Sequence, residues 1–126
     1  FEWVITNGGC PPSRDTVDIF VDEPPSASNA GPNQTICATT ATLAANTPTT
    51  GTGTWMLVSG SGTITTPGSP TSGLTALGLG TNEFEWVISN GVCPVTRDTV
   101  AIVVSGAPTP PNAGRTWSFA TYRIRC

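Results

Sequence analysis

The sequence predicts an all-β protein made of β-sandwich modules in tandem. Threonine is the commonest residue, and Gly (14) and Pro (12) break the β-branched stretches into short segments, as expected for short strands joined by many turns. No segment carries apolar residues at helical spacing over three turns, so we expect essentially no helix. The third observation is an internal repeat.

The repeat returns at a constant offset of 83 residues. The matching segments are 1–11 with 84–94, 14–17 with 97–100, and 29–31 with 112–114. Over residues 1–31 against 84–114, 19 of 31 residues are identical, which excludes chance. A period of this length is that of a whole domain, so the pattern predicts separate modules joined in a row.

The repeat also predicts the module boundaries. Residues 1–23 correspond to the last two strands of a preceding module, 24–28 to a linker, 29–105 to one complete module, 106–111 to a Pro-rich linker, and 112–126 to the start of a following module. Because the other strands of its module are absent, we expect the first segment to be completed by neighbouring copies or modules of itself.

Alternation within the complete module predicts seven strands. They lie near residues 35–37, 41–45, 53–58, 62–65, 73–77, 83–89 and 99–104. The predicted core comprises the inward-facing side chains Phe84, Trp86, Ile88, Val100, Ile102 and Val104, together with Leu43, Trp55, Leu57, Ile64, Leu74 and Leu77.

A string of motifs in residues 29–37, 51–55, 60–64 and 84–94 resembles the PKD-like, immunoglobulin-like repeats of giant surface proteins that gliding and related bacteria secrete. The resemblance covers residues 1–114. It implies seven-stranded immunoglobulin-like sandwiches in a secreted, extracellular adhesin or filament on the cell surface. It implies no catalytic residues, no cofactor and no particular ligand.

Two classes of function therefore stay open. The first is a structural stalk, which nearly identical neighbouring modules favour. The second is a carbohydrate-binding module of a secreted protein. Nucleic acid is not an expected partner, because the net charge is −3 and the repeat holds no basic cluster. No apolar run reaches the ~20 residues that a spanning helix needs, so no membrane span is expected.

The cysteines predict a structural disulfide. Each period holds two, and the complete module contains Cys37 and Cys93. The chain has no His for a zinc site or for a catalytic base. A Cys37–Cys93 bond would contribute ~4 kcal/mol by closing a long loop, and it would imply an oxidising compartment.

Other candidates have a simpler structural interpretation. Glu83 and Glu85 share a strand face like a glycosidase pair, but exposed strand residues explain them. Asp18, Asp22 and Glu23 form a possible calcium cluster, yet their counterparts one period later are Ala, Ser and Gly, so we predict no metal site.

The Trp residues at positions 3, 55 and 86 could form a platform for stacking sugars. Their alternating strand positions favour a place in the core instead. Asn7-Gly8 and Asn90-Gly91 predict tight turns with positive φ.

Glycans are the expected covalent partners. Thr16 and Thr99 each lie in an Asp-Thr-Val tripeptide that matches the O-glycosylation signal of the bacteria named above. Thr is also a good strand former, which would explain the motif without a glycan. Asn33 begins an Asn-Gln-Thr acceptor for N-glycosylation, a weaker signal.

The repeat stops after Gly114. Residues 115–126 share no identity with 32–43 and hold three of the five Arg residues. Suitable synonymous codons, shifted by one base, read Pro-Asp-Leu-Val-Phe-Cys, close to the Pro-Asn-Gln-Thr-Ile-Cys of 32–37. We hypothesise that 115–126 are a frameshifted translation of the next first strand, in which case Cys126 has no function.

Overall fold

The structure is a computed structural model that describes residues 1–111. Within that range the chain is all β and contains no helix, as the sequence predicts. The start of a following module and the frameshift hypothesis concern residues 112–126, which lie outside the described residues.

Residues 34–104 form two sheets. The larger sheet has the order β3-β9-β8-β5 and consists of β3 (Gln34–Ile36), β5 (Thr52–Ser59), β8 (Gly80–Ser89) and β9 (Thr96–Val104). The smaller sheet has the order β4-β7-β6 and consists of β4 (Ala41–Thr42), β6 (Thr63–Ile64) and β7 (Gly73–Thr75). These strands coincide in order and approximate position with the predicted ones.

The long hairpin of β8 and β9 is the centre of the larger sheet. Its turn is closed by a 3.1 Å hydrogen bond from the Cys93 amide to the Asn90 carbonyl, and Gly91 takes a φ of +52° there. This confirms the predicted tight turn, since only Gly reaches such a φ without strain. On the other side of β9, strand β3 runs parallel to it, with Ile36 opposite Val104.

The core lies between the two sheets, as in a β-sandwich. Its buried hydrophobic residues come from both sheets and from the loops beside them, namely Ala30, Leu43, Trp55, Leu74, Leu77, Phe84, Trp86, Ile88, Val100, Ile102 and Val104. Nearly all were predicted from strand alternation. One polar residue, Asn82, is buried on the same face of β8 as Phe84, two residues further along the strand.

Asn82 is fully hydrogen-bonded despite its burial. Its side-chain amide donates to the carbonyls of Gly78 (2.9 Å), Gly80 (3.3 Å) and Ile102 (3.3 Å), and its Oδ1 accepts from the Ser61 amide (2.8 Å). A buried amide with this many partners fixes the loop before β8 to the sheet at little desolvation cost.

The prediction that Leu57 belongs to the core is wrong. Its side chain is 43% exposed, although Trp55, two residues earlier on β5, is buried. The register between β5 and β8 shifts between Leu57 and Ser59, as at a β-bulge, and β5 is an edge strand. Leu57 is the last residue of β5 in register, opposite Phe84, and its side chain stays partly open to solvent because it lies at the sheet edge with the bulge directly after it.

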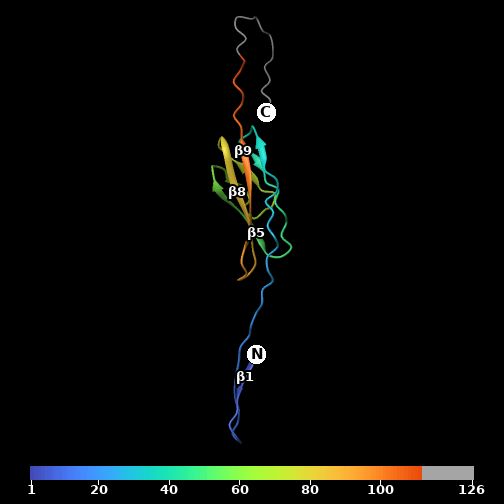
Figure 1. Cartoon of the computed structure of the whole chain (residues 1–126), viewed down its shortest axis with the longest axis vertical. Helices are drawn as coiled ribbons and strands as arrows, with labels where there is room; N and C mark the ends of the chain where they lie inside the picture. The colour runs from blue at the N-terminus through green and yellow to red at the C-terminus, as the bar shows by residue number, and fades with distance from the viewer. Residues whose placement is uncertain (112–126) are drawn as a thin grey trace.

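A separate hairpin precedes the sandwich. Strand β1 (Glu2–Ile5) pairs antiparallel with β2 (Ser13–Thr16), and nearly every residue before Pro25 is exposed. This hairpin lies beyond one end of the sandwich, next to the β8–β9 turn, and the chain leaves β9 at the other end (Figure 1). All buried residues of the described chain fall within 25–104. The sandwich therefore carries its own complete core.

Candidate functional site

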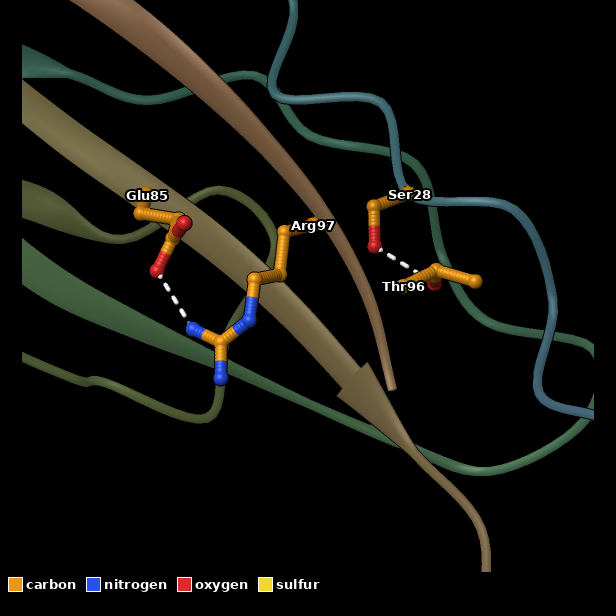
Figure 2. Close-up of polar contacts among 4 residues, drawn as sticks. All are labelled: Ser28, Glu85, Thr96 and Arg97. Carbon is orange, nitrogen blue, oxygen red and sulfur yellow. Dashed lines mark hydrogen bonds and ion pairs between the residues drawn. The ribbon is translucent and has the colours of Figure 1, made fainter. Parts of the chain in front are cut away.

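The junction through which the hairpin connects to the sandwich is rich in polar contacts. Thr96, at the start of β9, donates its hydroxyl hydrogen to the Ser26 carbonyl at 2.7 Å. The Ser28 and Thr96 hydroxyl oxygens also lie 2.7 Å apart, as Figure 2 shows. Because the Thr96 hydrogen is already used, Ser28 is the donor in this pair. The residues predicted as a linker are thus held against β9.

Asp98 continues the same attachment one step further along β9. Its Oδ2 accepts a hydrogen bond from the Ala30 amide at 2.7 Å. Asn46 fixes the other side of the segment, donating to the Ala27 carbonyl and accepting from the Asn29 amide, both at 2.9 Å. These contacts leave the segment before β3 little freedom to swing relative to the sandwich.

The β8–β9 turn makes the second half of the junction. Asn90 Nδ2 donates to the Glu23 carbonyl at 2.8 Å, and the Val92 amide donates to Asp22 Oδ2 at 3.0 Å. The Cys93 thiol lies 3.4 Å from the Asp22 carbonyl oxygen. Sequence reasoning placed Asn90 in a turn but missed this contact with the incoming chain, since nothing local to the turn signals it.

An ion pair recurs at the same position of both hairpins. Arg97 Nη1 lies 2.8 Å from Glu85 Oε2 (Figure 2), and Arg14 Nη1 lies 3.0 Å from Glu2 Oε2. The second pair lies one period after the first in the sequence, so the repeat preserves an interaction and not only a composition.

The predicted Cys37–Cys93 disulfide is wrong. Cys93 is a free thiol, as is Cys10, whereas Cys37 is disulfide-bonded. Strand direction gives the reason: parallel pairing puts Ile36 beside Val104, at the far end of β9 from Cys93. At ~3.3 Å per residue the length of β9 separates the two cysteines by more than ~20 Å, whereas a disulfide requires Cα atoms within ~7 Å.

Most of the candidate acidic residues form hydrogen bonds within the protein, and in the described chain they do not gather into a cluster. Glu83 Oε2 accepts from the Ser59 hydroxyl at 2.9 Å, and Glu85 pairs with Arg97. Within residues 1–111 no three His, Cys, Asp or Glu side chains gather as a metal site would require. Asp22, the calcium candidate best placed at the junction, is engaged by the Val92 amide instead.

The Trp residues divide between core and surface. Trp55 and Trp86 are buried with their ring centroids 5.1 Å apart, which agrees with the predicted core role. Trp3 is exposed on the separate hairpin. In the complete sandwich no Trp face is therefore presented to a sugar.

The candidate glycosylation residues all lie on the surface. Thr16 and Thr99 are exposed, each at the same position of its hairpin. Asn33 is exposed just before β3, and its Oδ1 accepts a hydrogen bond from the Ala101 amide at 2.9 Å. The Asp of the Asp98-Thr99-Val100 tripeptide has a structural use, because it binds the Ala30 amide.

Comparison with protein-family models and with curated proteins finds no match to this chain. No helix in residues 1–111 is long and apolar enough to cross a membrane.

Proposed function

We propose that this chain is part of the stalk of an extracellular bacterial surface adhesin or fibre, in which β-sandwich modules follow one another in a row. The observation that carries the proposal is the position of the two connections. The chain enters the sandwich at the end occupied by the β8–β9 turn and leaves at the opposite end of β9 (Figure 1). A module with connections at opposite ends adds its full length to the array.

We further propose an immunoglobulin-like topology for the module. The sheet orders β4-β7-β6 and β5-β8-β9 correspond to the B-E-D and C-F-G arrangements of an immunoglobulin sandwich, with the first strand beside the last. In antibody domains a disulfide between strands B and F packs against a Trp on strand C. Here Trp55 lies on β5, the counterpart of strand C, and packs directly against Trp86 on β8, the counterpart of strand F.

The hydrogen bonds at the junction support a mechanical role for the module. The incoming segment is hydrogen-bonded to β9 through Ser26, Ser28 and Ala30 and to the β8–β9 turn through Glu23. A flexible tether would leave these groups to water. The exposed Thr99 would display one O-linked glycan per module, so that sugars coat the stalk at regular intervals.

The test is the length of arrays with increasing module number. Small-angle scattering from chains of one, two and three periods should give a maximum dimension that rises by a constant increment per module. A maximum dimension that levels off would show that the modules fold back on one another and would exclude a stalk. Antibodies against residues 24–106 should also label the surface of intact cells of the source organism.

A glycan array distinguishes the stalk from the carbohydrate-binding alternative, which predicts saturable binding to the isolated module. Residues 24–106 should show no saturable binding, because both Trp side chains of the module lie in the core. Specific binding to one glycan class would favour the carbohydrate-binding alternative.

A further inference from the structure

We propose that successive modules of this repeat are linked to one another by disulfides, each between the cysteine at the Cys37 position of one module and the cysteine at the Cys93 position of the next. The inference rests on the 83-residue repeat and on strand geometry. It does not depend on what the array binds.

The Cys93 end of the bond faces the preceding module. Its thiol lies 3.4 Å from the carbonyl oxygen of Asp22, whose counterpart one period later, Ser105, directly follows β9. Cys93 is partly exposed and free. Cys10 holds the same position in the preceding hairpin and is likewise free.

The Cys37 end faces the following module. Strand β3 runs parallel to β9, Ile36 lies opposite Val104, and the Ser105 amide donates to the Ile36 carbonyl at 2.8 Å. Cys37 is the next residue along and therefore comes beside Ser105. It is exposed and disulfide-bonded while Cys93 is free, so its partner is not a cysteine of its own module and its sulfur is reached from outside at this end of the sandwich.

The repeat brings these two ends together. Asp22 and Ser105 are one period apart and hold the same position after the last strand. The Cys37 counterpart of the preceding module therefore lies beside Asp22, as Cys37 lies beside Ser105, about one strand spacing (~4.8 Å) away. Cys93 contacts that same residue from the next module. Both cysteines thus lie next to the same residue, from which their Cα atoms can approach the 4.4–6.8 Å that a disulfide requires.

Two of the three contacts that hold the turn in place do not depend on the side chains at this position, and only the bond from the Val92 amide to Asp22 Oδ2 does. Asn90 donates to the backbone carbonyl of Glu23, and the Cys93 thiol lies against the backbone carbonyl of Asp22. At the next junction Ser105 and Gly106 replace these acidic residues. The backbone carbonyls remain, so each junction offers the same two hydrogen-bond acceptors to the β8–β9 turn of the next module.

The bond forms by ordinary thiol–disulfide exchange. A small disulfide, or the disulfide of an oxidoreductase, is attacked by one cysteine thiolate and releases one thiol, leaving a mixed disulfide on the protein. The second cysteine thiolate attacks that mixed disulfide and releases the other thiol. The two protein thiols together lose two protons and two electrons, and the oxidant is reduced to two thiols. Secreted proteins meet such oxidants.

The test restores the preceding module around the native junction. Residues 29–83 are placed ahead of Phe1 in a chain of residues 1–111, which adds a second copy of Cys37. After refolding with oxidised glutathione, proteolysis and non-reducing mass mapping should link the peptide of Cys93 to a Cys37-type peptide. The link should persist in Cys37→Ser of the original module and disappear in Cys93→Ser. Cys10→Ser is the matched control and should leave it intact.

Three results would overturn the proposal. Loss of the link in Cys37→Ser of the original module would place the bond within one module. A link to Cys10 would mean a different pairing, and full alkylation of Cys93 in the oxidised chain would mean no bond. Folding of the added module is checked by the blue shift of Trp fluorescence that burial of Trp3 produces, with Trp3→Phe as the reference. If that chain does not fold, the natural array decides, because Gly9 and Val92 distinguish the cysteine peptides of neighbouring modules, and free thiols at internal junctions would refute the bond.

Discussion

The hairpin of β1 and β2 and the hairpin of β8 and β9 have nearly the same sequence but very different surroundings. Both close their turn with the same 3.1 Å bond between Cys and Asn backbone atoms, and Gly8 and Gly91 take φ values of +54° and +52°. Yet Trp3 is 73% exposed, whereas Trp86, one period later, is completely buried. Turn, register and ion pair repeat, and burial does not.

The difference distinguishes the features that a hairpin's own residues determine from the burial that requires the rest of the sandwich. The turn and the pairing of two adjacent strands depend on residues within the hairpin. Burial of the aromatic face requires the opposite sheet, which residues 29–79 provide for the second hairpin and nothing within residues 1–111 provides for the first. The first hairpin is also shorter, with strands of 4 residues against 10 and 9.

The largest effect should come from truncating the buried aromatic residue. Trp86→Ala should lower the free energy of unfolding by about 3–5 kcal/mol, because it empties the centre of the core. Trp3→Ala is the matched control and should change it by less than about 0.5 kcal/mol. Denaturant unfolding of the full chain measures both. Equal costs would mean that the first hairpin packs against the sandwich in solution.

The same pair of substitutions should lose its asymmetry once the preceding module is complete. In the chain with residues 29–83 ahead of Phe1, Trp3→Ala should destabilise the first module by a similar 3–5 kcal/mol. The transition of that module, followed by Trp fluorescence, provides the measurement. A cost that stays near zero would show that residues 1–23 are not the end of a sandwich.

A smaller effect is expected at Gly53, which lies directly beneath the Trp86 ring. A Cβ built on Gly53 would lie 2.1 Å from Trp86 Cζ2, too close for any side chain without moving the ring. Gly53→Ala should therefore cost about 1–3 kcal/mol through overpacking. Gly68→Ala is the control, since a Cβ there meets no atom within 4 Å. Unchanged stability in Gly53→Ala would mean that the indole ring is loosely held.

Much of this arrangement follows from local sequence. Each failure comes from the way strands pair with one another, which the local sequence does not show. Alternation along β8 and β9 predicts Phe84 and Ile102 in the core because each strand keeps a regular register. Leu57 fails because it ends the regular part of an edge strand, just before a bulge that the sequence does not show. The Cys37–Cys93 bond fails because counting cysteines per module ignores strand direction, and the parallel pairing of β3 places them at opposite ends.

At the candidate site the sequence predicts residue types but not contacts. The Asp-Thr-Val tripeptide indicates an exposed Thr99, which the structure has, but gives no sign that Asp98 binds the Ala30 amide. That contact joins residues 68 positions apart, and no local pattern reports it.

Asp98 offers a further way to compare the two hairpins. Asp98→Ala should cost about 1.5 kcal/mol, the low end for a hydrogen bond to a charged group, because the residue is only partly buried. Asp15→Ala should cost less, because Asp15 is exposed and its Oδ1 accepts from the neighbouring Thr16 amide at 3.0 Å. Hydrogen exchange at Ala30 is the specific readout and should speed up only in the first variant. Equal exchange in both would mean that the segment is held without Asp98.

The smallest difference should appear at the ion pairs, because neither pair is buried. The side chains of Arg97 and Glu85 are 52% and 20% exposed, and those of Arg14 and Glu2 are 56% and 42% exposed. Exposed pairs contribute ~0–1 kcal/mol and are screened by salt. A double-mutant cycle with Arg97→Gln and Glu85→Gln should give a coupling energy below ~1 kcal/mol that falls further at 0.5 M NaCl. The equivalent cycle at Arg14 and Glu2 should give a coupling near zero in global unfolding, because breaking that pair does not disturb the core. A large coupling at the first hairpin would mean that its order depends on an exposed ion pair, and the contrast with the buried hairpin would then rest on charge instead of on the missing sheet.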